Sequence, residues 1–233
     1  MTYVMSDLHG HYEKFRKMLD KIAFSDRDEL YVLGDVVDRG PQSAELLFDM
    51  SIRPNVYPIL GNHDFTAAIL LKKLCSQIED DTCTDLEDPN ILGLIASWQL
   101  DGGQATIDSF RKCTPDAREA LLEYLDEFVP YECIEANGHK FLLVHGGIPF
   151  GKRNVPLKKQ EVCELILERP MYDLRYYENI TLVTGHTPTV TIDPAYRGKI
   201  YHKNGHLAID CGAGFGLPLG CVRLEDFEEF YVE

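Results

Sequence analysis

The feature that most constrains the fold is a pattern that occurs three times early in the chain: a short apolar run, a polar loop and a helix-like segment. The apolar runs lie at residues 3–5, 30–33 and 56–60. Each precedes a loop rich in Asp, Asn, His and Gly, and the three loops read SDLHG, GDVVDRG and GNHD. Apolar residues then recur at helical spacing, which predicts three successive strand–helix units. Units of this kind form a parallel sheet with its loops at one edge.

The middle of the chain has a different pattern. Between about residues 78 and 130 the strand signals vanish and apolar clusters recur around 92–98 and 120–128, so we expect a helical cap inserted in the domain. Within it, the segment GGQAT at 102–106 lacks the spacing and the lysine of a phosphate-binding P-loop. This segment therefore predicts a turn between helices.

Strand signals return after Pro130. Residues 131–136 and 140–144 flank the pair Asn137-Gly138, which predicts a β-hairpin. A helix is expected at about residues 157–167, followed by strands at 180–184, 200–202, 206–210 and 221–224. The acidic run 225–229 is interpreted as a solvated strand end or turn. We expect this half to form an antiparallel sheet packed against the first sheet, as an α/β sandwich.

Composition limits the class of protein. A chain of 233 residues that is 45% hydrophobic can bury one substantial core, so we expect a single domain over residues 1–233. No apolar stretch approaches the roughly 18 residues of a spanning helix, and the N-terminus lacks a signal-peptide pattern, which predicts a cytoplasmic protein without a membrane partner. A net charge of -15 opposes binding to a nucleic acid duplex.

Five polar clusters directly follow predicted strands and carry the candidate chemistry. They are Asp7 with His9, Asp35, Asn62 with His63, His145, and His186. Carboxylates, imidazoles and an amide oxygen suit divalent ions such as Mn²⁺, Fe²⁺ or Zn²⁺, and one aspartate can bridge two ions about 3.5–4 Å apart. A lone aspartate is more often a helix cap and a lone histidine a core residue bonded to the backbone. Five such clusters at five strand ends favour a metal centre.

The blocks SDLHG, GDVVDRG, GNHD, VHGG and TGHTP, in this order across most of the chain, resemble those of the calcineurin-like metallophosphoesterases. Within that family the chain is most similar to the phosphoprotein phosphatase type, serine/threonine phosphatases of the bacterial kind. The resemblance implies an α/β fold, a sandwich of two mixed β-sheets flanked by helices, with the inserted helical cap at about residues 78–130.

The resemblance also implies the role of each site residue. One metal ion would be held by Asp7, His9 and His186, the other by Asn62 and His145, with Asp35 bridging the two. A hydroxide between the metals would attack phosphorus, and His63 would protonate the leaving oxygen while Asp38 orients its imidazole. Arg39 would bind phosphate oxygens as a planar fork.

A second phosphate-binding arginine is implied upstream of the last histidine motif. Arg169 has about the right position, but its neighbours lack the tryptophan often found there, and Arg175 is close enough to compete. We assign the role to Arg169.

These features predict a metal-dependent phosphoric monoester hydrolase acting on phosphoserine or phosphothreonine in proteins or on small phosphoesters. Two divalent ions are the implied cofactors, with Mn²⁺ favoured and Fe or Zn also suitable. The alternative is a symmetrical dinucleoside tetraphosphatase or short-polyphosphate hydrolase, since similar bacterial enzymes with this core cleave phosphoanhydrides. A non-catalytic scaffold of the same fold is a third reading, but a scaffold would be expected to lose ligands or the histidine acid. The oligomeric state stays open.

Overall fold

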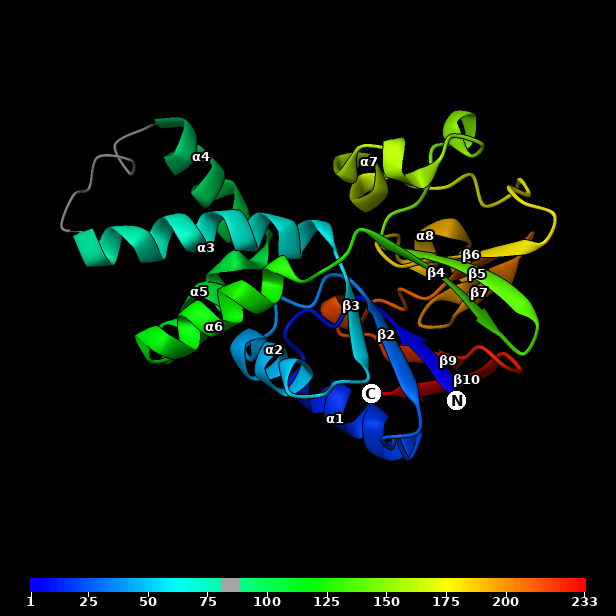
Figure 1. Cartoon of the computed structure of the whole chain (residues 1–233), viewed down its shortest axis with the longest axis horizontal. Helices are drawn as coiled ribbons and strands as arrows, with labels where there is room; N and C mark the ends of the chain where they lie inside the picture. The colour runs from blue at the N-terminus through cyan, green and yellow to red at the C-terminus, as the bar shows by residue number, and fades with distance from the viewer. Residues whose placement is uncertain (81–88) are drawn as a thin grey trace.

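Two mixed five-stranded sheets form the centre of the structure, a computed structural model that describes residues 1–80 and 89–233 (Figure 1). The first sheet has the strand order β10-β9-β1-β2-β3 and the second the order β4-β5-β6-β8-β7. The strands of the first sheet are β1 (Thr2–Met5), β2 (Glu29–Leu33), β3 (Val56–Ile59), β9 (Leu219–Arg223) and β10 (Glu228–Val232). Those of the second are β4 (Tyr131–Ala136), β5 (His139–Val144), β6 (Ile180–Thr184), β7 (Tyr201–Lys203) and β8 (His206–Ala208). The predicted sandwich of two mixed sheets is confirmed.

The three predicted strand–helix units build the parallel part of the first sheet. Strands β1, β2 and β3 pair in parallel and alternate with the helices α1 (Tyr12–Lys21), α2 (Ser43–Ser51) and α3 (Asn62–Asp80). Helix α3 already begins at Asn62, and the Gly61 carbonyl accepts the Phe65 N–H at 3.0 Å. Asn62 and His63 therefore lie in the first turn of a helix rather than in a loop.

The second sheet departs from the expected antiparallel arrangement. The hairpin of β4 and β5 is confirmed, and Asn137 and Gly138 both adopt the positive φ angles of its turn (48° and 78°). Strands β5, β6 and β8, however, pair in parallel. Long connections that contain α7 (Val162–Leu167) and α8 (Thr189–Ile192) separate these strands, and only such crossovers bring the chain back to run in parallel.

Two smaller elements also differ from expectation. Helix α7 is shorter than the predicted helix at residues 157–167, because Gln160 and Glu161 are extended and separate it from a short 3₁₀ turn. Strand β10 was missed: the acidic run at 225–229 contains a turn and then the first residues of β10. An exposed edge strand tolerates charged residues, so it lacks the alternating apolar pattern that identifies a strand.

Apolar side chains from facing strands fill the space between the two sheets. Val4, Leu33 and Ile59 from the first sheet and Leu143 and Val183 from the second belong to one buried cluster. A larger cluster packs the other face of the first sheet against its helices, through residues such as Met5, Phe15, Leu30, Leu46 and Met50. These two layers fix the strands from whose ends the candidate site residues project.

The helical cap lies to one side of the parallel strands (Figure 1). It consists of α4 (Pro89–Trp98), a π-helical turn (Gln99–Gly103), α5 (Gln104–Phe110) and α6 (Pro115–Asp126), packed beside α3. The described part is helical, as predicted, while residues 81–88 of the expected cap lie outside the described residues. The GGQAT segment does form a break between helices, because Gly102 has a φ of 109°.

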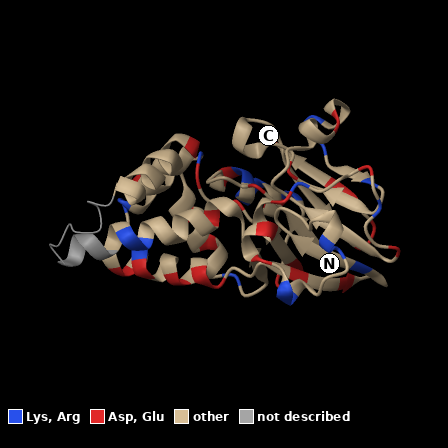
Figure 2. Cartoon of the chain, turned by 90° about the horizontal axis from the view of Figure 1, so that it is seen from above, with Lys and Arg blue, Asp and Glu red and all other residues tan. Residues whose placement is uncertain are grey.

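Charged residues are distributed over the whole described molecule. Figure 2 shows Asp and Glu on the cap and on the sheet-bearing half, with Lys and Arg scattered among them. Scattered basic residues do not make the continuous positive face that tracks a phosphate backbone. Within residues 1–80 and 89–233, no helix combines the length and the apolar character needed to cross a membrane.

Candidate active site

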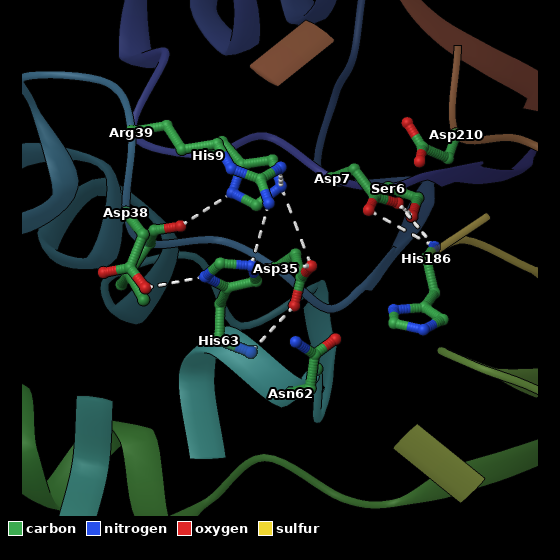
Figure 3. A network of polar contacts seen from close by, with 12 residues as sticks. Ser6, Asp7, His9, Asp35, Asp38, Arg39, Asn62, His63, His186 and Asp210 are labelled. Atoms are coloured by element: carbon green, nitrogen blue, oxygen red, sulfur yellow. Dashed lines mark hydrogen bonds and ion pairs between the residues drawn. The ribbon is translucent and has the colours of Figure 1, made fainter. Parts of the chain in front are cut away.

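The candidate site residues come from strand ends of both sheets and meet where the two sheets adjoin. Asp7 follows β1, Asp35 follows β2 and His63 follows β3, whereas His145 and His186 follow β5 and β6 of the second sheet. Figure 3 shows His9, Asn62 and His63 around Asp35, with Asp7 and His186 to one side of it. The structure thus brings together the five clusters that the sequence placed at separate strand ends.

Asp35 is the centre of the arrangement and is 3% exposed. Its Oδ1 lies 3.2 Å from His145 Nε2, and its Oδ2 lies 3.7 Å from His9 Nε2 and 3.9 Å from His63 Nε2. Two groups of possible metal ligands result: His9, Asp35 and His63 in one, and Asp35, His145 and His186 in the other. Asp35 belongs to both, as expected of a bridging ligand.

The side chains around the His186 imidazole differ from those that the resemblance implied. The resemblance grouped its imidazole with Asp7 and His9, but in the structure the imidazole is grouped with Asp35 and His145. Its contact with Asp7 is made by the backbone, since the His186 N–H lies 3.2 and 3.1 Å from the two carboxylate oxygens of Asp7. The geometry therefore favours His186 as a partner of His145.

Hydrogen bonds to backbone carbonyls orient the two best-buried imidazoles of the site. His9 Nδ1 lies 3.0 Å from the Val37 carbonyl oxygen and His145 Nδ1 lies 2.7 Å from that of Leu33. A carbonyl only accepts, so each Nδ1 carries the proton, and Nε2 is the nitrogen directed at Asp35. This backbone support of one ring nitrogen is typical of metal-ligating histidines.

Burial and mutual charge set the protonation of the site. Burial lowers the pKa of His9 to about 3 and, together with the charge of His145, that of His186 to about 4. Burial alone would raise the pKa of Asp35, but the surrounding imidazoles, His145 foremost, hold it well below its usual range. An ionised carboxylate and neutral imidazoles are the forms that bind a metal ion.

The hydrogen-bond contacts of His145 indicate that the nitrogen and oxygen ligands of the site fit divalent cations. His145 Nε2 faces two oxygens, Asp35 Oδ1 at 3.2 Å and Asn62 Oδ1 at 3.1 Å, while its Nδ1 already faces a carbonyl. Burial alone would lower the pKa of His145, yet Asp35 and Asp7 raise it to about 10, which reports how strongly this spot favours a positive charge. Nitrogen and oxygen donors of this mixture suit Mn, Fe or Zn.

A second group of side chains stands beside the ligands. His63 Nδ1 lies 2.7 Å from Asp38 Oδ2, and Arg39 NH2 lies 3.1 Å from His63 Nε2. Burial alone would lower the pKa of His63, but the Asp38 hydrogen bond and the Asp35 charge raise it above its ordinary value. The Arg39 guanidinium also packs 4.6 Å from the ring centre of Phe215. His63, Asp38 and Arg39 therefore lie together, as the resemblance implied.

Backbone strain is concentrated at this site. Ten described non-glycine residues have a left-handed φ, and six of them are predicted site residues. The six are Asp7, His9, Asp35, Asp38, Arg39 and His186, with φ between 45° and 72°. Such conformations each cost about 1–3 kcal/mol and persist where the surroundings fix them and function uses them.

Two buried aspartates at the site were not among the predicted site residues. Asp64 is fully buried and accepts the N–H groups of Gly61 and Val36, which joins the GNHD loop to the GDVVDRG loop. Asp210, also buried, follows β8 and helps burial to raise the pKa of Asp7. Its position after an apolar strand is the same signal that identified Asp35, and could have found it.

The surroundings of the two candidate arginines differ. Arg169 is exposed, and its charge contributes to the lowered pKa of His186, so it lies within electrostatic reach of the site. Arg175 instead donates from Nε to the Tyr177 carbonyl oxygen at 3.2 Å and lies beside Gly205. This placement favours Arg169 over Arg175 as a phosphate contact.

A pocket of about 320 Å³ adjoins the His63 side of the site, between α3 and α4. Most of its surface is apolar, with polar groups among the lining residues. Its lining comprises Asn62, His63, Phe65, Thr66, Ile69, Leu70, Leu94, Ser97, Trp98 and Asp101. An apolar pocket with a few polar groups beside the candidate acid is typical of a site for an organic part of a ligand.

Comparison with known proteins identifies one family. The model of the calcineurin-like phosphoesterase family matches residues 2–219. A symmetrical bis(5'-nucleosyl)-tetraphosphatase of Wigglesworthia glossinidia brevipalpis is 31% identical over 112 residues, which cover 47% of this chain and 41% of that protein. The protein of the same name from Shewanella baltica (strain OS155 / ATCC BAA-1091) is 31% identical over 150 residues, 63% of this chain and 44% of its own length. The alignments thus span less than half of these curated relatives.

A solved structure matches over almost the whole chain. It is a crystal structure provisionally named as a diadenosine tetraphosphatase, with a TM-score of 0.67 and 18% sequence identity, and the match covers 99% of this chain and 92% of that one. At this identity the likeness shows the fold alone.

Proposed function

The chain belongs to the calcineurin-like phosphoesterase family, and on that basis we propose that it hydrolyses dinucleoside tetraphosphates symmetrically, into two nucleoside diphosphates. The observation that carries a hydrolytic function is the convergence on Asp35 of imidazole ligands, a guanidinium and a hydrogen-bonded His63–Asp38 pair. The curated relatives bear the name of symmetrical tetraphosphatases, which favours this substrate over the phosphoprotein that the sequence led us to expect.

Two divalent ions would be held by the six predicted ligands: Asp7, His9, Asp35, Asn62, His145 and His186. When bound, they would supply Lewis-acid activation of water and would neutralise phosphate charge. Arg39, whose guanidinium lies between His9 and His63, would bind oxygens of the phosphoryl group under attack. Arg169 would contact the same phosphate chain from the His186 side.

His63 has the position of a proton donor. Its Nδ1 is engaged with Asp38, so Nε2 is the nitrogen that faces the cleft beside Arg39. As the phosphorus–oxygen bond breaks, its electron pair passes to the leaving oxygen, which takes the proton from Nε2. Water supplies the hydroxyl added to phosphorus, and its other proton replaces the one lost from Nε2. The leaving group therefore departs on the His63 side, where the apolar pocket lies.

The substrate proposal predicts a product pattern. We expect the protein loaded with Mn²⁺ to convert diadenosine tetraphosphate to ADP, with a kcat/KM at least about tenfold above that for a phosphoserine peptide, a difference of roughly 1.4 kcal/mol. Chromatography of the nucleotides and phosphate release from the peptide measure the two reactions. Formation of ATP and AMP would refute symmetrical cleavage, and a higher kcat/KM for the peptide would restore the phosphoprotein reading.

The pocket between α3 and α4 gives a second prediction. Leu94 lines it and is 60% exposed, so Leu94→Ala should remove part of an apolar contact, about 1 kcal/mol, and raise KM for diadenosine tetraphosphate about fivefold. Inorganic tripolyphosphate has no nucleoside, and its KM should not change. Leu92→Ala is the matched control, because Leu92 is an exposed leucine of the same helix that does not line the pocket. Equal KM shifts for both substrates would rule out the pocket as a nucleoside site.

A further inference from the structure

The turn that carries Asp38 and Arg39 is held by the cap, not by the sheet alone. Asp38 and Arg39 have φ angles of 72° and 68°, which are strained for residues with side chains. The Arg39 N–H donates to the Gly102 carbonyl oxygen at 3.0 Å, and the Asp38 N–H donates to Thr106 Oγ1 at 2.8 Å. Both acceptors belong to the GGQAT segment, which sequence reasoning had interpreted only as a turn.

Two side chains of the cap also bond the Asp38 carboxylate. Thr106 Oγ1 donates to Oδ1 at 2.7 Å, and Trp98 Nε1 donates to Oδ2 at 2.8 Å, where His63 Nδ1 also lies at 2.7 Å. Asp38 and Thr106 are fully buried, and Trp98 is 4% exposed. Water cannot replace these donors, so the cap alone supplies two of the three partners of the carboxylate that contacts His63.

The two glycines of the GGQAT segment allow Trp98 and Arg39 to pack closely against it. A Cβ on Gly103 would lie 2.3 Å from Trp98 Cε2, so only glycine lets the indole reach Asp38. At Gly102 a Cβ would lie 2.6 Å from Arg39 Cγ, and its φ of 109° also requires glycine. Trp98, the two glycines and Thr106 therefore form one unit, which we call the cap clamp.

We propose that Trp98 and Thr106 are positioning residues: the cap clamp fixes the Asp38 carboxylate and, through it, the imidazole of His63. The inference rests on the proposed role of His63 as proton donor. The cap is then part of the catalytic machinery as well as a wall of the pocket. Losing one such supporting hydrogen bond typically costs about 10–100-fold in activity.

Substrates that differ in leaving group test this role. Phenyl phosphate has a poor leaving group that needs a proton, whereas 4-nitrophenolate leaves without one. We expect Thr106→Val and Trp98→Phe to lower kcat for phenyl phosphate about 10–100-fold while kcat for 4-nitrophenyl phosphate falls much less, with little change in KM. Thr106→Ser, which restores the hydroxyl, should recover most of the loss. Equal losses on both substrates would overturn the inference, because they would indicate a general structural defect.

Ser109→Ala is the matched control. Ser109 is a buried hydroxyl one turn further along α5 that bonds the Ala44 N–H and Glu45 of α2, so its loss perturbs the same helix contact without touching Asp38. It should leave the ratio of the two kcat values unchanged. A change as large as that of Thr106→Val would count against the cap clamp.

A readout independent of catalysis separates this inference from the proposed function. In the Zn²⁺-loaded protein, the His63 Nδ1 proton held by Asp38 should give a downfield proton resonance, assigned by its absence in His63→Asn. We expect the resonance in the wild type and in Ser109→Ala, and its loss in Thr106→Val. Persistence of the signal in Thr106→Val would refute the clamp even if the wild type hydrolysed none of the substrates.

Discussion

Replacement of Asp35 by asparagine is expected to abolish detectable conversion of diadenosine tetraphosphate to ADP and to strip the protein of its metal. Asp35 is the one carboxylate shared by both ligand groups, and three imidazole nitrogens lie within 3.9 Å of its oxygens. The amide keeps the shape but removes the negative charge. Removing one partner of a buried charge pair costs about 3–5 kcal/mol, which corresponds to a loss of about 10²–10⁴ in affinity for the cations.

Metal content after gel filtration and titration calorimetry with Zn²⁺ measure this loss directly, and chromatography of the ADP formed from diadenosine tetraphosphate measures its consequence. Asp49→Asn is a matched control, because Asp49 of α2 is also buried, at 6% exposure, but it pairs with Arg53, which follows that helix, away from the site. The control should keep its metal and its turnover. An Asp35→Asn protein with full metal content and near wild-type turnover would contradict the central role of this carboxylate.

The parts of the molecule that could be predicted are those with a local signature. The parallel units of the first sheet, the Asn137-Gly138 hairpin and the ligand residues at strand ends all follow from short patterns. The parallel pairing of β5, β6 and β8 could not be predicted this way, since strand direction depends on where long connections return. The edge strand β10 was missed because an exposed edge does not need an alternating apolar pattern.

The structure brings the predicted ligands together, but no sequence pattern indicated the residues that support Asp38. Asp7, Asp35 and His145 each stand in a recognisable block, whereas Trp98 and Thr106 act on Asp38 from 60 and 68 residues away. A contact at that separation leaves no periodicity to detect. The GGQAT segment was noticed for its glycines, yet their purpose, close approach of Trp98 and Arg39, becomes visible only once the cap is packed against the GDVVDRG turn.

His63→Asn is expected to lower turnover by about 10²–10⁴-fold, the usual contribution of a positioned proton donor. His63 is suited to the role because Nδ1 is fixed by Asp38, Nε2 faces Arg39, and the Asp38 hydrogen bond and Asp35 charge overcome burial to raise its pKa. The loss should be largest for phenyl phosphate and small for 4-nitrophenyl phosphate, because only the first leaving group requires a proton.

The change in the ratio of the kcat values for the two esters also ranks the residues around His63. If the proton passes from Nε2, the ratio of kcat values for the two esters should change most in His63→Asn, and less but in the same direction in Thr106→Val and Trp98→Phe. His202→Asn is the control, since His202 is an exposed residue of β7 in the second sheet whose ring contacts that of Phe227, with ring centres 4.7 Å apart. A uniform loss on both esters in His63→Asn would assign His63 to metal or phosphate binding instead, in keeping with its place in the ligand group of His9 and Asp35.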